Sequence, residues 1–474
     1  MPARHLLVAA FSLALAPPTQ AQAPSAELAQ AAAAYAAKVT ASALFVSGRS
    51  LDSVMEQEFA PVRPLDAMIR ALLEVDVDYE ARAVSCRLGV GRATAVFHEG
   101  LGCSLVQGEV DPERRRYARP LAPFDLLAAR TDAPWPRGDG AAATAQHVDA
   151  AALAAALAAA LDAAFEEPNP KQPVFTRAVA VVRRGQLVAE RYGDGVDAQT
   201  PLPGWSMTKS LTNALIGAHV ARGAFDVDAR PTVSAWREEG DPRAGVRNRH
   251  LLAMSAGLRW REDYTDASSD ALQMLLFRRD HAAAYAQQPA AAAPGASFQY
   301  ASGATNLLCR ELRSAYVGRR AYWQMPARFF QRLGMHTALI ETDPSGTFVG
   351  SSYGYASARD WARLGLLYLQ DGVMFGDRVL PEGWVARSTS REASPPSEGR
   401  YGWHLWLNRD PDGEGPRARR WPTLPRDVFS MDGHEGQYVV VVPSDELVVV
   451  RLGCTKDGGF SIARLVEDVR AACR

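Results

Sequence analysis

Two predicted β-hairpins, separated by residues 193–436, constrain the fold of this chain most strongly. In residues 177–192, two short runs with alternating apolar side chains flank a turn at residues 183–186. In residues 437–452, two valine-rich runs flank a turn at residues 444–446. Strand-like runs that are joined by a few turn residues are typical of antiparallel strand pairs. We therefore expect an antiparallel sheet built from two distant parts of the chain.

Helical patterns surround and separate the two hairpins. An alanine-dominated run at residues 148–165 predicts a helix, because alanine is the strongest helix former, and a closing helix is expected at residues 460–472. Residues 225–430 alternate short helical stretches with loops rich in glycine and proline. This order indicates an α/β protein of the α+β type, in which terminal helices flank an antiparallel sheet and the middle forms a mostly helical lobe. We expect the active site between the two lobes.

The first 23 residues have the pattern of a secretory signal peptide. Arg4 and His5 precede an apolar stretch at residues 6–16, and residues 21–23 form a small-x-small cleavage site. The apolar stretch is too short to span a bilayer, and we predict no membrane span elsewhere in the chain. The pattern predicts a periplasmic or secreted protein.

Residues 24–146 are predicted to form an N-terminal region of unassigned role. A helix is expected at about residues 26–38, strand-like segments lie within residues 79–106, and an irregular stretch occupies residues 111–140. An oxidising compartment would permit disulfides between some of the five cysteines. Cys86 and Cys103, which are close in sequence and sit in strand-like segments, are the best candidate pair.

Charge and histidine spacing exclude two classes of function. The formal net charge is −1 and there is no long basic run, so we predict no nucleic-acid partner. The nine histidines show no spacing typical of metal ligands. We therefore expect no metal and no other cofactor. The expected partner is a small-molecule substrate.

Ser206 and Lys209 form a Ser-x-x-Lys motif at the start of a predicted helix. Only four lysines occur in the chain, against a much larger number of arginines. A lysine can accept a proton once burial lowers its pKa, whereas an arginine cannot. Residues i and i+3 share a helix face, so the amine would reach the hydroxyl. Chance alone would place a serine there about one time in four, so the motif needs partners.

Two further segments supply these partners. Tyr300-Ala301-Ser302 stands at the entry to a predicted helix at residues 304–314. The segment 432–437, Asp-Gly-His-Glu-Gly-Gln, is a glycine-flanked turn that leads into the C-terminal hairpin. With these motifs in this order, residues 147–474 resemble the serine β-lactamase and penicillin-binding-protein superfamily, especially its class C-like branch. That branch includes esterases, D-aminopeptidases and 6-aminohexanoate-dimer hydrolases.

The resemblance implies a role for each motif. Ser206 would be the acylated nucleophile, Lys209 its general base and Tyr300 a proton relay to the leaving group. The oxyanion hole would be formed by the backbone N–H groups of Ser206 and Gln437. The loop at residues 259–266 resembles the loop that borders the cleft in the nylon-oligomer hydrolases. The implied substrate-binding candidates are Ser302, His434, Gly436 and Tyr264, whereas Trp205 is expected in the core.

The third motif differs from that of penicillin-active relatives, which usually have Lys-Thr-Gly or a similar cationic triplet. This chain has His434-Glu435-Gly436, in which histidine is mostly neutral at pH 7 and the glutamate repels anions. We therefore predict a serine hydrolase that acts through an acyl-enzyme on a carboxylic ester or amide. The alternatives are β-lactamase or D-amino-acid peptidase activity, and a penicillin-binding-like sensor that acylates without turnover.

Ser352 is a rival nucleophile, because Gly350-Ser-Ser-Tyr-Gly354 matches Gly-x-Ser-x-Gly and is followed by Asp432 and His434. A nucleophile elbow needs a buried strand immediately before the serine. Residues 341–347 instead read as a polar turn. We therefore expect Ser206, and not Ser352, to carry the reaction.

Overall fold

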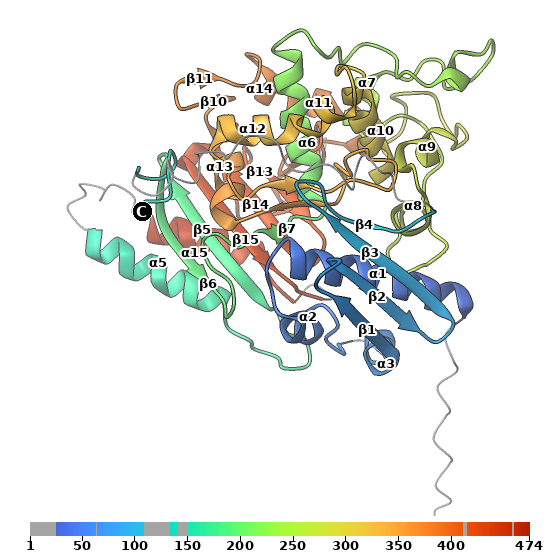
Figure 1. Cartoon of the computed structure of the whole chain (residues 1–474). Coiled ribbons are helices and arrows are strands. Elements are labelled where there is room, and N and C mark those ends of the chain that lie inside the picture. Colours follow the sequence, from blue (N-terminus) through green and yellow to red (C-terminus); the bar gives the residue numbers. More distant parts are fainter. Residues whose placement is uncertain (1–24, 63, 109–132, 141–149, 411–414, 457–458) are drawn as a thin grey trace, which may run out of the picture.

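The computed structural model describes residues 25–62, 64–108, 133–140, 150–410, 415–456 and 459–474. The predicted signal peptide and most of the irregular stretch at residues 111–140 lie outside these ranges. The predicted fold class is confirmed: antiparallel sheets combine with helices, which lie on both faces of the largest sheet (Figure 1).

The main sheet has six strands, and each neighbouring pair in it is antiparallel. Both predicted hairpins are present, and they are joined edge to edge because the last strand of the C-terminal hairpin pairs with the first strand of the other. The strands, in spatial order, are β12 (Trp406–Leu407), β13 (Phe429–Gly433), β14 (Gln437–Val442), β15 (Leu447–Gly453), β5 (Thr176–Arg183) and β6 (Gln186–Tyr192).

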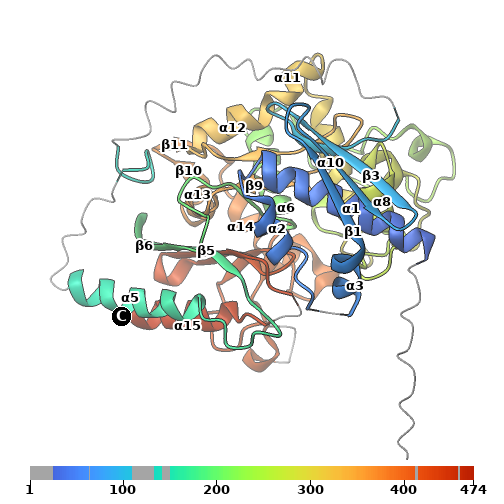
Figure 2. The ribbon, with the colours of Figure 1, turned by 60° about the horizontal axis from the view of Figure 1, so that its bottom comes forward.

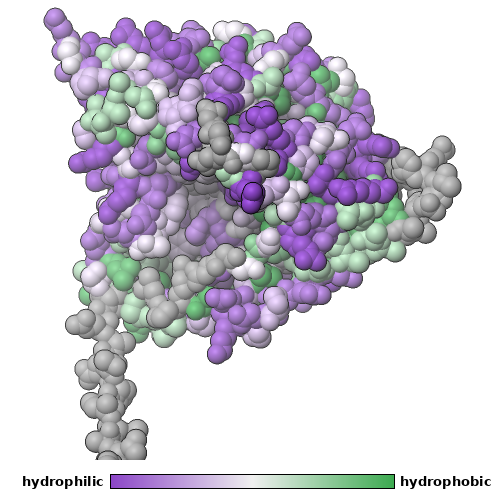
Figure 3. Space-filling model, turned by 180° about the vertical axis from the view of Figure 1, so that it is seen from behind, coloured by the Kyte–Doolittle hydropathy of each residue, from purple (hydrophilic) through white to green (hydrophobic). Residues whose placement is uncertain are grey.

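Alternate side chains of the main sheet point to two different hydrophobic layers. On one face lie the predicted helices α5 (Ala150–Ala164) and α15 (Ile462–Ala472), side by side in Figure 2. On the other face lie α6 (Met207–Val220) and α13 (Ala358–Leu369). Val440 faces the first layer and Val439 the second. The outer surface seen in Figure 3 is mostly hydrophilic, with hydrophobic residues in separate patches.

The mostly helical lobe occupies the region between the two hairpins and carries two small sheets. None of the described helices is long and apolar enough to cross a membrane. The helices are α7 (Asn248–Leu252), α8 (Asp270–Phe277), α9 (His281–Ala286), α10 (Ser302–Arg313), α11 (Arg319–Trp323), α12 (Met325–Leu333) and α14 (Trp384–Ser388). The short strands are β7 (Leu202–Pro203), β9 (Gly354–Ala356) and β8 (Leu339–Ile340) in one sheet, and β10 (Val373–Met374) and β11 (Asp377–Arg378) in the other.

The N-terminal region is a long helix packed on a four-stranded antiparallel sheet. Helix α1 (Ala26–Phe45) extends beyond the predicted end at residue 38, because residues 39–43 are also buried. The remaining elements are α2 (Leu51–Gln57), α3 (Pro64–Leu72), β1 (Leu73–Asp78), β2 (Ala83–Leu88), β3 (Gly91–His98) and β4 (Gly102–Leu105).

The predicted disulfide between Cys86 and Cys103 is wrong: both cysteines are free thiols. Cys86 lies on β2 opposite Ala93, and Cys103 lies on β4 opposite Phe97, with strand β3 between them. Two strand spacings alone separate the cysteines by roughly 10 Å, and the offset from Ala93 to Phe97 along β3 adds to this distance, whereas a disulfide requires Cα atoms within about 7 Å. Sequence proximity suggested a pair that the strand order keeps apart.

Buried polar contacts attach the N-terminal region to the rest of the chain. The carboxylate of Glu341, which is fully buried, pairs with the Lys38 ammonium and accepts hydrogen bonds from Ser42 Oγ (2.8 Å) and the Cys103 N–H (2.7 Å). Glu58 of the N-terminal region likewise forms a buried ion pair with Arg177 in strand β5 of the main sheet, with 2.7 Å between Glu58 Oε1 and Arg177 Nη2. One hydrophobic core runs through both parts. We therefore expect them to unfold together.

Replacing Glu341 by glutamine should lower the free energy of unfolding by about 3–5 kcal/mol, because it leaves the Lys38 ammonium buried without a counter-charge. Urea titration monitored by tryptophan fluorescence measures this change. Glu74→Gln is the control: its partner Arg87 and Glu74 itself are both exposed, so the effect should stay below about 1 kcal/mol. Equal effects of the two substitutions would contradict the docking role of Glu341.

Candidate active site

Ser206 lies at the start of α6, at the end of a strained turn. After β7, the Gly204 N–H donates to the Gly354 carbonyl of the neighbouring strand (2.8 Å), and Trp205 adopts a left-handed conformation with φ of 47°. A side chain at position 204 would meet the ring of Trp361 at 2.2 Å, so this position requires glycine. Left-handed non-glycine residues are uncommon and cluster at functional sites. The turn holds Ser206 at the N-cap of α6.

Lys209 is buried directly beside Ser206. Its Nζ lies 3.1 Å from Ser206 Oγ, 3.0 Å from Ser302 Oγ and 2.9 Å from the Ser351 carbonyl oxygen. Burial lowers the pKa of Lys209 from 10.5 to about 8, and the nearby Glu262 carboxylate opposes this shift in part. About a tenth of Lys209 is therefore neutral at pH 7 and able to accept a proton, against less than a thousandth for an unperturbed lysine.

Tyr300 approaches the same hydroxyl, immediately before α10. Burial and the charge of Glu262 raise the pKa of its phenol well above 10, and a side-chain hydrogen bond with Ser206 acts in the opposite direction. Lys209 Nζ lies 4.7 Å from the centroid of the Tyr300 ring. The ring packs against Trp406 and Tyr401. Tyr300 therefore stays protonated at neutral pH and can donate a proton.

Glu262 was not identified from the sequence, although it lies in the loop at residues 259–266 that was singled out for Tyr264. Its carboxylate accepts hydrogen bonds from the Ser302 N–H (2.9 Å), the Ser302 hydroxyl, Trp260 Nε1 (2.5 Å) and the Tyr264 hydroxyl (2.5 Å). Ser302 is fully buried and joins Lys209 to Glu262. The sequence signal for Glu262 is its place between two aromatic residues, Trp260 and Tyr264, in a loop that was already expected to border the cleft.

The turn at residues 433–437 packs against the Ser206 turn. A side chain at Gly433 would meet the Gly204 carbonyl oxygen at 2.1 Å, so the two backbones are in close contact there. Gln437 opens strand β14, and its side-chain amide donates to the carbonyls of His434 (3.0 Å) and Gly453 (2.7 Å). Gly436 has a φ of +81°, which glycine adopts without strain. This close contact brings the start of β14 next to the start of α6.

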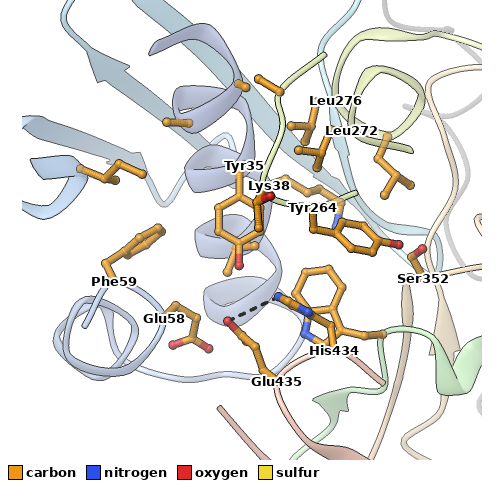
Figure 4. Close-up of a pocket in the computed structure, with 18 of the residues that line it drawn as sticks. Tyr35, Lys38, Glu58, Phe59, Tyr264, Leu272, Leu276, Ser352, His434 and Glu435 are labelled. Carbon is orange, nitrogen blue, oxygen red and sulfur yellow. Dashed lines mark ion pairs between the residues drawn. The ribbon is translucent and has the colours of Figure 1, made fainter. Parts of the chain in front are cut away.

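The cavity beside Ser206 has a volume of about 310 Å³ (Figure 4). His434, whose side chain is 47% exposed, lines it together with Tyr264, and their ring centroids are 5.6 Å apart. Trp205 is half-buried and also lines the cavity, so it is not the core residue that the sequence suggested. Its ring stacks on that of Tyr35 from the N-terminal region, at 6.5 Å. No sequence motif indicated that contact.

The rival Ser352 lines the same cavity but does not lie on a nucleophile elbow. Residues 349–352 form a turn, and the segment that follows is the short strand β9 in place of the required helix. Ser352 Oγ is within 2.9 Å of Ser351 Oγ. Among the described residues there is no cluster of three or more His, Cys, Asp and Glu side chains that could hold a metal ion.

Comparison with known proteins identifies the family of this chain. The sequence model of the Beta-lactamase family matches residues 128–466, which is more than half of the chain. The chain belongs to the beta-lactamase family. This membership confirms the predicted enzyme class, a serine hydrolase related to the β-lactamases.

Relatives of this beta-lactamase family member include several hydrolases. A 6-aminohexanoate-dimer hydrolase from Paenarthrobacter ureafaciens is 27% identical over 296 residues, which cover 60% of this chain and 73% of that protein. The structure of EstCE1, a hydrolase with promiscuous acyltransferase activity, has a TM-score of 0.51 and 16% identity over 69% of this chain and 100% of its own. A Bacillus anthracis protein provisionally named as a 6-aminohexanoate-dimer hydrolase has a TM-score of 0.50 and 22% identity, over 63% and 78% of the two chains. The two structures support the fold.

Proposed function

We propose that this protein hydrolyses carboxylic esters or amides through an acyl-enzyme on Ser206. The observation that carries the proposal is the 3.1 Å contact between Ser206 Oγ and the buried Lys209 amine, whose pKa is about 8. A serine hydroxyl is a weak nucleophile until an adjacent base removes its proton. In this site, neutral Lys209 is the base.

Acylation moves two protons. Ser206 Oγ attacks the substrate carbonyl carbon while its proton passes to Lys209 Nζ, and the carbonyl oxygen becomes an oxyanion. The backbone N–H groups of Ser206 and Gln437 stabilise that charge. Ser206 begins helix α6 and Gln437 begins strand β14, and the Gly433–Gly204 contact brings these two starting points together. Tyr300 donates its proton to the leaving alcohol or amine as the bond to it breaks. Lys209 then returns a proton to Tyr300.

Deacylation uses the same groups in reverse order. Water attacks the ester carbonyl of the acyl-enzyme, and its proton passes through the Tyr300 phenol to neutral Lys209. The bond from the carbonyl carbon to Ser206 Oγ then breaks, and Ser206 regains its proton from Lys209. Glu262 is a positioning residue in this scheme, because it orients Ser302, which in turn holds the Lys209 amine.

The motif His434-Glu435-Gly436 indicates the charge of the preferred substrate. His434 occupies the position where penicillin-active relatives have a cation, and the carboxylate of Glu435 lies 4.0 Å from His434 Nε2. A histidine beside a carboxylate offers a substrate carboxylate less attraction than the permanent positive charge of a lysine. This favours uncharged esters and amides over penicillins.

The rate should rise with pH through the pKa of Lys209. Because the neutral amine is the reactive form, kcat/KM for p-nitrophenyl acetate should increase about tenfold per pH unit below pH 8 and level off above it. Initial rates between pH 5.5 and 10, corrected for spontaneous hydrolysis, measure this profile. A profile that is flat from pH 6 to 9 would contradict Lys209 as the base.

Turnover separates a hydrolase from a sensor that acylates once. Release of p-nitrophenol should continue over many equivalents per protein molecule. A burst that stops at one equivalent, with an acyl group retained on Ser206 in the intact-mass spectrum, would favour the sensor.

A further inference from the structure

We propose that the N-terminal region forms one wall of the active site and selects substrates with an uncharged, apolar acyl chain. This inference rests on the proposed acyl-enzyme on Ser206. It assigns to residues 26–69 a role in substrate choice.

The apolar part of the wall consists of side chains that are far from the catalytic motifs in sequence. Leu28, Ala31 and Val39 of α1, with Phe59 and Ile69, line the cavity that contains Ser206. Leu272 and Leu276 of α8 form the opposite side (Figure 4). Helices α1 and α8 are in contact, so the cavity lies between the N-terminal region and the helical lobe. Burial of apolar surface is therefore the main attraction that it offers.

The lysines in the cavity wall are already paired with protein groups. Lys38 is bound to Glu341, and Lys456 Nζ donates to the Glu58 carbonyl (2.8 Å) and lies 3.9 Å from the Asp66 carboxylate. Glu58 Oε1 is held by two arginines, whereas its buried Oε2 has no hydrogen-bond partner within the described part of the chain. Figure 4 shows the Glu58 and Glu435 carboxylates on the same side of the cavity. Among the described lining residues, an anionic acyl group would meet three carboxylates, those of Glu58, Asp66 and Glu435, and two lysines that are already paired with protein groups.

The position of Tyr300 places the acyl chain, and not the leaving group, in this cavity. Tyr300 protonates the leaving group in the proposed reaction, and its ring packs against Tyr401 and Trp406. None of these three residues lines the cavity, although Trp205, Ser206 and His434 do. The leaving group therefore departs on the Tyr300 side of Ser206, and the acyl chain extends toward α1.

The volume of the cavity indicates which acyl chains it can hold. Its volume of about 310 Å³ is roughly twice that of an engineered apolar cavity that accommodates benzene. Benzene itself has six carbon atoms, so acyl chains of at least six carbons fit this space.

Hydrolysis of p-nitrophenyl acetate, butyrate, hexanoate and octanoate tests the inference. For the full chain, kcat/KM should rise about threefold to fourfold per added methylene up to hexanoate. For p-nitrophenyl hydrogen succinate, which has the length of the butyrate ester but carries a carboxylate, the enzyme-catalysed kcat/KM should be at least about 100-fold lower than for butyrate, after the fast spontaneous reaction of this ester is subtracted. An absence of chain-length dependence, or equal rates for succinate and butyrate, would overturn the inference.

Two substitutions in the wall should change the preferred length of the acyl chain in opposite directions. Ala31→Phe fills the cavity and should lower the hexanoate-to-acetate ratio of kcat/KM by about tenfold, whereas Phe59→Ala enlarges it and should raise the octanoate-to-hexanoate ratio. The control is Phe45→Ala, the same deletion in α1, where the ring packs against Phe97 and Tyr79 outside the cavity. It should leave both ratios unchanged, and a change as large as that of Phe59→Ala would refute the assignment.

The proposed function itself can fail separately. If the wild-type protein hydrolyses none of these esters and a fluorophosphonate does not label Ser206, the acyl-enzyme is wrong. If acetate is hydrolysed with labelling of Ser206 but the ratios do not respond to Phe59→Ala or Ala31→Phe, only the role of the N-terminal region is wrong.

Discussion

Ser206→Ala should lower kcat for p-nitrophenyl acetate by about 10⁴-fold or more, because it removes the atom that forms the covalent bond. It should also abolish labelling by a fluorophosphonate probe, which reacts with activated serine hydroxyls. The side chain is small and half-buried at a helix N-cap, where it makes no capping hydrogen bond. The loss should therefore reflect chemistry, and thermal unfolding of the variant should match that of the wild type.

Ser352→Ala is the comparison that decides between the two serines. Ser352 lies in the same cavity, but no lysine, histidine or carboxylate is within hydrogen-bond distance of its hydroxyl in the described structure, where Ser351 Oγ is its partner. This variant should still be labelled and should keep turnover within about tenfold of the wild type. Loss of labelling in Ser352→Ala, with labelling kept in Ser206→Ala, would reverse our assignment.

Lys209→Arg should be nearly as damaging as Lys209→Ala, with kcat/KM lower by a factor on the order of 10³. Arginine keeps the positive charge but does not release its proton at accessible pH, so it cannot serve as a base. The rise of the rate near pH 8 should disappear together with the activity. Steady-state kinetics of the two variants across pH make the comparison.

Lys171→Arg is the matched control, because Lys171 is exposed and lies outside the cavity. It should leave the rate and its pH profile unchanged. A Lys209→Arg variant that keeps a tenth or more of the wild-type kcat/KM would show that position 209 needs only a cation.

Much of the main sheet could be predicted because its signals are local. The valine-rich alternation in residues 437–452 and the alanine-rich run in residues 148–165 each specify an element from neighbouring residues alone. The spacing of Ser206 and Lys209 on one helix likewise predicted a contact that the structure contains, at 3.1 Å. In these cases periodicity determines which side chains share a face.

Contacts between distant segments could not be predicted in this way. The failed pairing of Cys86 with Cys103 depended on strand order, because β3 pairs with β2 along one edge and with β4 along the other. Glu262 has no motif of its own, and its importance is visible only once Ser302 and Tyr264 converge on it. The contact of Tyr35 with Trp205 joins two regions that no local pattern connects.

The pairing of β15 with β5 has a consequence for synthesis of the protein. The β5–β6 hairpin leaves the ribosome while β14 and β15, which complete its sheet, are still to be made. Until then one backbone edge of β5 has no partner, and unpaired edges of this kind promote aggregation. Closing the sheet across such a long loop is slow. A nascent chain that stops before residue 447 would lack the strand that protects this edge, so chaperone demand should peak late in translation.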